Sequence, residues 1–252
     1  MSRVAGPRPT HEHPLLGAPR RDAISALLLA MMTAAVFILV ADDATRGHIQ
    51  HADASFLRKM IAIRSGSLTA VAKIFNYLGL VYVTLPVRLA IALFLGVRRR
   101  WWHFAAFATS IVLAEASIGL LKSVYDRARP PGSLVATSGT SFPSGHAVAA
   151  SVTVVAAVIA LFPEGNRRYA WGAVAAAFSL IMGLSRAYLG AHWLSDAVAG
   201  VLLGTSIALC VALGVHALRE HGLTVRNPGG EKTPAQPVAA RPETEIPQAA
   251  DG

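Results

Sequence analysis

The stretch SFPSGHAVAASVTVVAAVIALF, residues 141–162, joins a short polar signal to an apolar run that is long enough to cross a bilayer. The signal Pro143-Ser144-Gly145-His146 stands directly in front of the run, where a helix is expected to begin. Proline fits the first turn of a helix, because its missing N–H has no partner there in any case. Free N–H groups at the positive end of a helix dipole attract anions. The stretch therefore predicts a membrane helix with an anion site at its N-terminal end.

Other apolar runs of similar length occur along the chain. They lie at residues 23–41, 80–97, 101–121, 169–189 and 193–218. Lipid cannot satisfy the polar groups of the backbone, so each run is expected to form a helix. With 54% hydrophobic and 15% charged residues, the chain is also too apolar for an ordinary soluble domain. We therefore expect an all-α fold, a six-transmembrane-helix bundle that forms one domain over residues 23–218.

The segments outside this bundle differ in character. Residues 1–22 are expected to form a cytoplasmic N-terminal segment, and residues 219–252, rich in Pro, Ala, Glu and Gly, a disordered cytoplasmic tail. The arginine pair at residues 20–21, just before the first run, also allows a secretory signal peptide. The sequence LVA at residues 39–41 is a poor cleavage site for such a peptide, which favours a retained membrane anchor.

Basic residues set the expected orientation. Short arginine clusters at residues 20–21, 98–100 and 167–168 fall on one side of the predicted bundle. The positive-inside rule places these clusters, and with them both termini, in the cytoplasm. We therefore expect a protein of the cell (inner) membrane whose other face looks toward the periplasm or the outside. An anionic membrane surface accounts for the net charge of +9, so no nucleic-acid partner is expected.

Residues 53–78 combine apolar and basic side chains at roughly helical spacing. The pattern predicts an interfacial helix after the first span, or two helices broken at Ser65-Gly66, on the outer side of the membrane. A helix packed over the bundle fits the same pattern equally well.

Two ionisable residues lie inside the apolar runs. Arg88 is interpreted as structural, because it can snorkel to the cytoplasmic face or cap the helix that Pro86 interrupts. Glu115 needs a partner, either a hydroxyl of a neighbouring helix or a basic residue of the site. Gly200 and Gly204 form a GxxxG pair, which predicts close helix packing inside the bundle rather than a dimer.

Three cations stand at the expected outward ends of the apolar runs: Lys122, Arg129 and Arg186. Nearby carboxylates are too few to pair with all of them, which indicates an anionic ligand. Arginine offers several planar donors and lysine a point charge, a combination that suits phosphate oxygens. The backbone N–H groups of Ser144 and Gly145 would point at the same ligand. We therefore predict a phosphate-binding site made of these five residues.

His192 and Asp196 stand four residues apart, which places them on one face of a helix. The carboxylate could then accept a hydrogen bond from one imidazole nitrogen and leave the other as a nucleophile or base. His146 lies beside the expected anion site, where it can protonate a leaving oxygen. A helix-capping pair or a two-ligand metal site would show the same spacing, and Lys122 and Arg129 could be interfacial anchors. The combination favours catalysis of phosphate chemistry by both histidines and the aspartate.

These residues spell the three-part signature K-x6-RP, PSGH and SR-x5-H-x3-D. The matching positions are Lys122, Arg129 and Pro130; Pro143, Ser144, Gly145 and His146; and Ser185, Arg186, His192 and Asp196. By this signature, and by its layout over residues 20–218, the chain resembles the type 2 phosphatidic acid phosphatase superfamily. That family comprises integral-membrane lipid phosphatases related to vanadium haloperoxidases and glucose-6-phosphatase. Its six-helix core agrees with the apolar runs.

The resemblance implies a phosphohistidine mechanism. His192 would attack phosphorus, Asp196 would orient His192, and His146 would protonate the departing oxygen. The cations and amides named above would hold the transferring group, so that neither a metal nor another cofactor is required. Water would then hydrolyse the phosphohistidine.

The resemblance also implies a lipid phosphate substrate that enters from the bilayer. Similar bacterial proteins act on undecaprenyl diphosphate, phosphatidate, phosphatidylglycerol phosphate or lipid A, and undecaprenyl diphosphate is our favoured substrate. Two other functions stay open. One is a phosphotransferase that passes the phosphoryl group to another lipid, and the other is a non-catalytic phospholipid carrier. A carrier has no need for a nucleophile, an acid and an orienting carboxylate.

Overall fold

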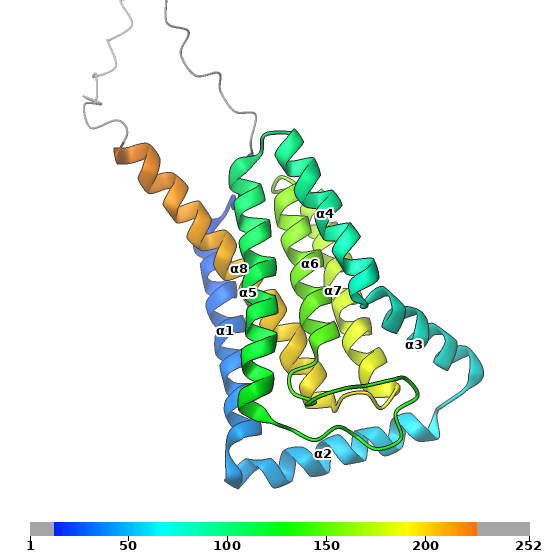
Figure 1. The fold of residues 1–252 in the computed structure, drawn as a ribbon. Helices are drawn as coiled ribbons and strands as arrows, with labels where there is room; N and C mark the ends of the chain where they lie inside the picture. The colour runs from blue at the N-terminus through cyan, green and yellow to red at the C-terminus, as the bar shows by residue number, and fades with distance from the viewer. Residues whose placement is uncertain (1–12, 226–252) are drawn as a thin grey trace, which may run out of the picture.

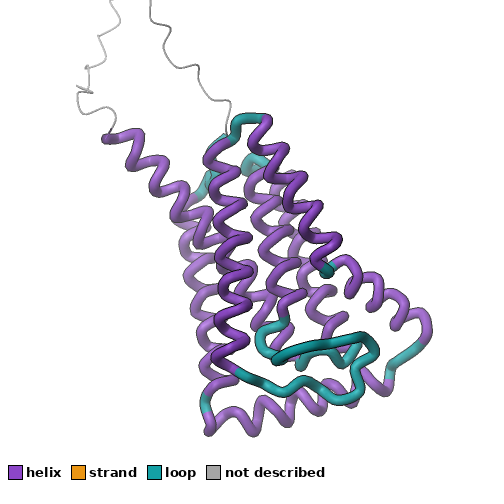
Figure 2. The backbone as a smooth tube through the Cα atoms, viewed as in Figure 1, coloured by secondary structure: helices purple, strands orange, loops and turns teal. Residues whose placement is uncertain are grey.

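The computed structural model describes residues 13–225, which form eight α-helices (Figure 1). Their bounds are α1 Pro19–Ala41, α2 Asp43–Ala62, α3 Gly66–Leu78, α4 Val81–Val97, α5 Trp101–Tyr125, α6 Gly145–Leu161, α7 Asn166–Tyr188 and α8 Leu194–Val225. No strand occurs in these residues (Figure 2). The predicted all-α class is therefore confirmed.

Helix α6 is the central helix of the bundle. It packs against α5, α7 and α8, and α1 packs against the outer side of α8. Helix α2 and the long loop of residues 126–144 lie across one end of the bundle (Figure 1). The beginning of α1 and the end of α8 lie at the opposite end. The bundle thus has one end that is covered by α2 and one from which both described chain ends emerge.

Two glycines let α8 approach α6 closely. A Cβ atom added to Gly200 would lie 2.8 Å from the Ser144 carbonyl oxygen and 2.9 Å from the Ala147 Cβ. A Cβ atom at Gly204 would lie 2.6 Å from the Val148 carbonyl oxygen. Real Cβ atoms do not come so close, so these positions need glycine. The predicted role of the GxxxG pair in packing inside the bundle is confirmed.

All six apolar runs are helical, but their lengths differ from the prediction. Four helices, α1, α5, α7 and α8, are each long and apolar enough to cross a membrane. Helices α3 and α4 pass the same test only as a pair, bent by 51° at the break between them. Helix α6 has 17 residues, or about 26 Å of length, which is less than the roughly 30 Å of a bilayer core. Length and composition therefore support four or five candidate spans rather than six.

The ends of the bundle also differ from the prediction. Helix α8 continues to Val225, seven residues past the expected boundary at 218. Leu15 and Leu16 precede α1 and are fully buried against α5, α6 and α8, so this part of the N-terminal segment belongs to the core. The remainder of the predicted tail, and residues 1–12, lie outside the described residues.

The segment after α1 forms two helices, α2 and α3, as the second of our alternatives predicted. The break lies at residues 63–65, and the Ser65 hydroxyl caps α3 by accepting a hydrogen bond from the Leu68 amide at 3.3 Å. Helix α2 starts ten residues earlier than expected, at Asp43. Its buried residues Asp53 and Leu57 pack against the bundle, whereas α3 leaves an apolar row of side chains exposed.

Arg88 and Glu115 are partners. The Nη1 atom of Arg88 lies 2.6 Å from Oε1 of Glu115, and its Nε atom donates to the Thr153 hydroxyl at 2.9 Å. The guanidinium group therefore joins α4, α5 and α6 by hydrogen bonds. Arg88 has a structural role, but by linking three helices rather than by snorkelling or capping. The partner of Glu115 is basic, but it is Arg88 and not one of the predicted site residues.

Candidate active site

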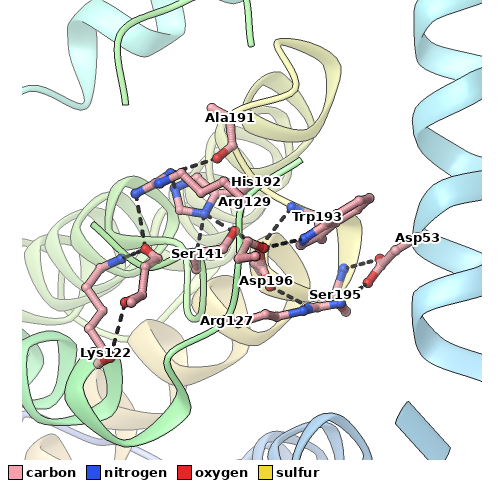
Figure 3. A network of polar contacts seen from close by, with 12 residues as sticks. Asp53, Lys122, Arg127, Arg129, Ser141, Ala191, His192, Trp193, Ser195 and Asp196 are labelled. Carbon is pink, nitrogen blue, oxygen red and sulfur yellow. Dashed lines mark hydrogen bonds and ion pairs between the residues drawn. The ribbon is translucent and has the colours of Figure 1, made fainter. Parts of the chain in front are cut away.

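The predicted site residues lie on six segments that meet at the end of the bundle covered by α2. Lys122 lies in the last turn of α5, Arg129 in the loop of residues 126–144, Ser144, Gly145 and His146 at the start of α6, Arg186 in the last turn of α7, His192 in the loop before α8 and Asp196 in the first turn of α8. Figure 3 shows the polar contacts that link several of these residues. The three motifs thus come together at one place.

His192 is almost fully buried, with 3% of its surface exposed. Its Nδ1 atom lies 2.7 Å from the Ser141 carbonyl oxygen, and its Nε2 atom lies 3.2 Å from Nη1 of Arg129 (Figure 3). A carbonyl oxygen only accepts hydrogen bonds, so Nδ1 must carry the ring proton. In the neutral ring, Nε2 therefore holds the lone pair and faces a guanidinium group.

Asp196 does not bond directly to His192, which corrects the prediction. Its Oδ2 atom is 3.7 Å from Nδ1 of His192, and it accepts instead from the Trp193 amide at 2.8 Å and from the Ser141 hydroxyl. Its Oδ1 atom accepts from Arg127 at 2.6 Å. The reason lies in the helix boundary: α8 begins at Leu194, so His192 precedes the helix and the four-residue spacing does not align the two side chains.

Burial lowers the pKa of His192 to about 4, because the charged ring would lose its hydration. The positive charges of Arg186 and Arg129 act in the same direction, while Asp196 opposes them. The ring is therefore neutral at pH 7, with its Nε2 lone pair available for bonding.

Lys122 and Arg129 hold the loop of residues 126–144 over the site. Lys122 Nζ donates to the Thr140 carbonyl oxygen at 2.6 Å. Arg129 donates to main-chain carbonyl oxygens, which are those of Gly139 at 2.9 Å, Ser138 at 2.7 Å, Thr140 at 3.1 Å and Ala191 at 2.7 Å. These bonds leave the positive charge of Arg129 intact and fix it beside His192.

Three motif residues carry buried polar atoms that have no hydrogen-bond partner among the described residues. They are Nε of Arg186, Nε2 of His146 and the hydroxyl oxygen of Ser144. A buried polar atom without a partner costs about 1–3 kcal/mol, so such atoms are rare and call for a reason. Their occurrence on residues that the sequence assigns to one site indicates a place for a polar ligand.

The start of α6 corrects two details of the predicted anion site. The helix begins at Gly145 with Ser144 as its N-cap, so Pro143 precedes the first turn. The Ser144 amide is not free, because it donates to the Asp196 carbonyl oxygen at 3.0 Å and ties α6 to α8. The Gly145 amide lies in the first turn, where N–H groups have no partner within the helix. A Cβ at Gly145 would only touch Ile118, at 3.7 Å, so the protein itself does not require glycine there.

The sequence reasoning missed a buried charge network behind the site. Arg127 bridges Asp196 and Asp53, with Nη2 lying 2.7 Å from Oδ2 of Asp53 (Figure 3). Asp53, on α2, is 3% exposed and also accepts from the Ser195 amide at 2.9 Å. Arg127 lies inside the K-x6-RP motif, two positions before Arg129, so its place in the motif could have marked it as a candidate site residue. Asp53 gave no such signal, because only the packing of α2 brings it to this place.

Residues 103–220 match the PAP2 superfamily. The chain is 29% identical over 178 residues to phosphatidylglycerophosphatase B of Bacillus subtilis, covering 67% of this chain and 85% of that protein. It is 34% identical over 123 residues to the lipid A 1-phosphatase of Rhizobium etli, covering 44% of this chain and 50% of that protein. It is 33% identical over 135 residues to the undecaprenyl-diphosphatase of Sulfolobus acidocaldarius, covering 50% of this chain and 61% of that protein. The chain thus spans most of the first relative and smaller parts of the other two.

The fold also has a counterpart among solved structures. A crystal structure of a transmembrane PAP2 type phosphatidylglycerolphosphate phosphatase from Bacillus subtilis superposes with a TM-score of 0.61 and 25% sequence identity. The match covers 82% of this chain and 98% of that chain. Sequence, fold and the convergence of the three motifs agree: residues 103–220 match the PAP2 superfamily, and the chain is similar in sequence and fold to integral-membrane lipid phosphatases of that superfamily.

Proposed function

We propose that the protein hydrolyses the phosphate or diphosphate group of a membrane lipid through a phosphohistidine on His192. One observation carries the proposal. The neutral His192 ring directs its Nε2 lone pair at a position flanked by Arg129. In the same site, Arg186, His146 and Ser144 each have a buried polar atom without a partner among residues 13–225. This arrangement combines a nucleophile, an acid and fixed positive charge.

In the first step, Nε2 of His192 attacks phosphorus. A nitrogen–phosphorus bond forms, the bond from phosphorus to the lipid oxygen breaks, and His146 gives a proton to that oxygen. For this step His146 starts as the imidazolium ion, a form that the negative charge of the bound phosphate stabilises. The positive charge that develops on His192 is stabilised by the Ser141 carbonyl at Nδ1 and by the nearby Asp196. Lys122, Arg129 and Arg186, with the Gly145 amide and the Ser144 hydroxyl, balance the charge on the phosphoryl oxygens.

In the second step, a water molecule enters the position left by the lipid oxygen and hydrolyses the phosphohistidine. His146, which is now neutral, takes a proton from the water as the water oxygen attacks phosphorus. The bond between phosphorus and Nε2 breaks, inorganic phosphate leaves, and His192 returns to its neutral tautomer. Each proton and electron pair is accounted for by these two histidines.

A cavity at the membrane side of the site supports a lipid leaving group. It has a volume of about 530 Å³ and lies between α4, α5 and α6. One end reaches Gly145 and His146, and most of its other walls are apolar, including Leu85, Leu89 and Ile111. An alkyl chain in this cavity would place the attached oxygen next to His146, which is the proposed acid.

The proposed orientation places the active site at the periplasmic or outer side of the cell membrane. The arginine clusters at residues 20–21, 98–100 and 167–168 flank helix ends at the end of the bundle opposite to α2 (Figure 1). The positive-inside rule puts that end, and both termini, in the cytoplasm. In this arrangement the chain crosses the membrane six times, with α3 and α4 as one bent crossing and α6 as a short one.

We propose phosphatidylglycerol phosphate as the first substrate to test, because the relative named for that activity is matched over 85% of its length. Undecaprenyl diphosphate, which we favoured from the sequence, belongs in the same panel with phosphatidate and lipid A. Relatives named for phosphatidylglycerophosphate, lipid A and undecaprenyl diphosphate match this chain at 29%, 34% and 33% identity. Sequence identity therefore does not choose among these three substrates.

The test is phosphate release by the purified protein in detergent with excess EDTA. We expect release from at least one lipid of the panel by the wild type, and none by His192→Ala. Acid-labile, base-stable phosphate on the wild-type protein after rapid quenching would identify the phosphohistidine. Release that persists in His192→Ala would refute the mechanism. A folded wild type that releases phosphate only when a second lipid is added as acceptor would instead be a transferase.

A further inference from the structure

Helix α3 closes one side of the active site, and we infer that its Asn76 is a positioning residue for Arg186. The inference rests on the proposed function, in which Arg186 holds the transferring phosphate. Residues 66–78 were expected only to lie at the membrane interface or over the bundle. Their contacts give them a part in the chemistry.

The first contact joins the two side chains directly. Arg186 lies in the last turn of α7 and is 3% exposed. Its Nη1 atom donates to the side-chain oxygen of Asn76, whereas its Nε atom has no partner in the described part of the chain. Because arginine only donates, the atom of Asn76 that faces it must be the oxygen. Asn76 therefore fixes one edge of the guanidinium group and leaves Nε for a ligand.

Further contacts fix α3 against α7, so that Asn76 has a defined place. The Tyr188 hydroxyl accepts from the Ser65 amide at 3.2 Å and bonds the Thr69 hydroxyl at 3.0 Å. Near the other end of α3, the rings of Phe75 and Phe178 are 5.6 Å apart. Contacts at both ends of α3 therefore fix its position along α7.

The end of α3 also touches the proposed acid. A Cβ atom added to Gly79 would overlap the His146 ring and would lie 3.3 Å from Cε of Met182. Gly79 also lines the cavity that reaches His146 and Gly145. The junction between α3 and α4 therefore lies against the site itself, with Asn76 on Arg186 and Gly79 on His146.

The choice of an amide matters for this role. A carboxylate at position 76 would form an ion pair with Arg186, neutralise its charge and repel a phosphate. A neutral oxygen orients the guanidinium group and leaves its full positive charge for the ligand. A purely structural contact would predict the opposite preference, because a carboxylate is the stronger partner for a buried arginine.

The test compares Asn76→Ala and Asn76→Asp with the wild type, in detergent. KM and kcat are measured for the best lipid of the panel, and the inhibition constant is measured for orthovanadate, a mimic of the transferring phosphate. We expect Asn76→Ala to raise KM and the vanadate constant about tenfold, as for loss of a hydrogen bond to a charged group. Asn76→Asp should raise both further, without lowering the thermal midpoint. Tyr77→Phe, at the exposed next position, is the matched control.

The outcomes separate this inference from the proposed reaction. Wild-type values of KM and of the vanadate constant in Asn76→Asp would overturn the role of Asn76, whatever the substrate. A wild type that hydrolyses nothing would refute the proposed reaction, and stabilisation by vanadate then becomes the readout. If vanadate raises the thermal midpoint of the wild type but not of Asn76→Asp, the inference stands. If vanadate stabilises neither protein, the inference fails as well.

Discussion

The Nδ1 atom of His192 lies 2.7 Å from the backbone oxygen of Ser141, and the hydroxyl of the same serine donates to Asp196. A main-chain carbonyl, rather than the carboxylate, therefore accepts the ring proton. Asp196 acts on the ring through the residues that it holds, which are Ser141 on one side and Trp193 on the other.

This relationship predicts graded effects of two substitutions. Ser141→Ala keeps the carbonyl and removes its tether, so kcat should fall by about tenfold or less, the value of one hydrogen bond. Asp196→Asn disturbs both neighbours of His192 as well as Arg127, and should lower kcat on the order of 10²-fold by misplacing the ring. Ser133→Ala, whose hydroxyl bonds to nearby Val135, is the control for the loop. Equal kcat in Asp196→Asn and the wild type would contradict the arrangement.

The pKa of His192 predicts activity that persists in acid. The attacking ring must be neutral, and its folded-state pKa is lowered from 6.5 to about 4. Protonation of His192 should therefore lower kcat/KM only as the pH falls through about 4. The ionisation of the substrate, measured separately by phosphorus NMR, must be divided out. An acid limb at 6.5 that remains after this correction would show that the ring titrates like an exposed histidine.

The same shift predicts a stability effect of known sign. Unfolding exposes His192 and returns its pKa to 6.5, so the unfolded state binds the proton more readily than the folded one. The folded protein therefore loses stability as the pH falls from 6.5 toward 4. Thermal midpoints of His192→Gln should decline less over this range than those of the wild type. His48→Gln, at an exposed position, should behave as the wild type does.

Gly79→Ala is expected to impair the proposed acid. The added methyl would displace the His146 ring, so kcat should fall on the order of 10²-fold for a lipid phosphate, whose alcohol needs a proton to leave. A phosphate ester of a more acidic alcohol should be affected much less, because its oxygen leaves without protonation. Comparison of kcat for the two substrates checks this. A uniform loss on both would indicate general distortion of the site.

Two glycines of α8 should respond in opposite ways to the same change. Gly204→Ala forces a Cβ against the backbone of α6 and should destabilise the protein by about 1–3 kcal/mol. Gly214→Ala meets no atom within 4 Å and should be neutral or stabilising by up to about 1 kcal/mol. Unfolding in denaturant, followed in detergent, measures both. Similar effects at the two positions would show that helix propensity, not the contact with α6, decides the outcome.

The helices were predictable because the bilayer leaves the backbone few alternatives. An apolar run must satisfy its own hydrogen bonds, and each of the six runs is helical. The motif residues stay a prediction as site residues, made because their types match phosphate chemistry, and the fold brings them to one end of the bundle. Helix ends were harder to predict: α6 ends within one residue of the expected position, but α8 continues seven residues past it, to Val225. Composition locates a helix, but caps and packing decide where it begins and ends.

Contacts within the site depended on details that the sequence does not carry. The His192–Asp196 prediction assumed a continuous helix, and the helix starts two residues too late for it. The Ser144 amide was expected to be free, but α8 approaches closely enough for the Asp196 carbonyl to accept from it. Asp53 and Asn76 are ordinary polar residues of amphipathic helices until the fold sets them against Arg127 and Arg186.

The 17 residues of α6 have a consequence for where chemistry takes place. This central helix, about 26 Å long, lies beside neighbours of 23 and 25 residues, and its first turn is set back from the end of α5 (Figure 1). In the proposed function, a headgroup therefore has to pass the end of α5 to reach His146. One added turn at the start of α6 would move this first turn by about 5 Å and change the length of headgroup that the site accepts.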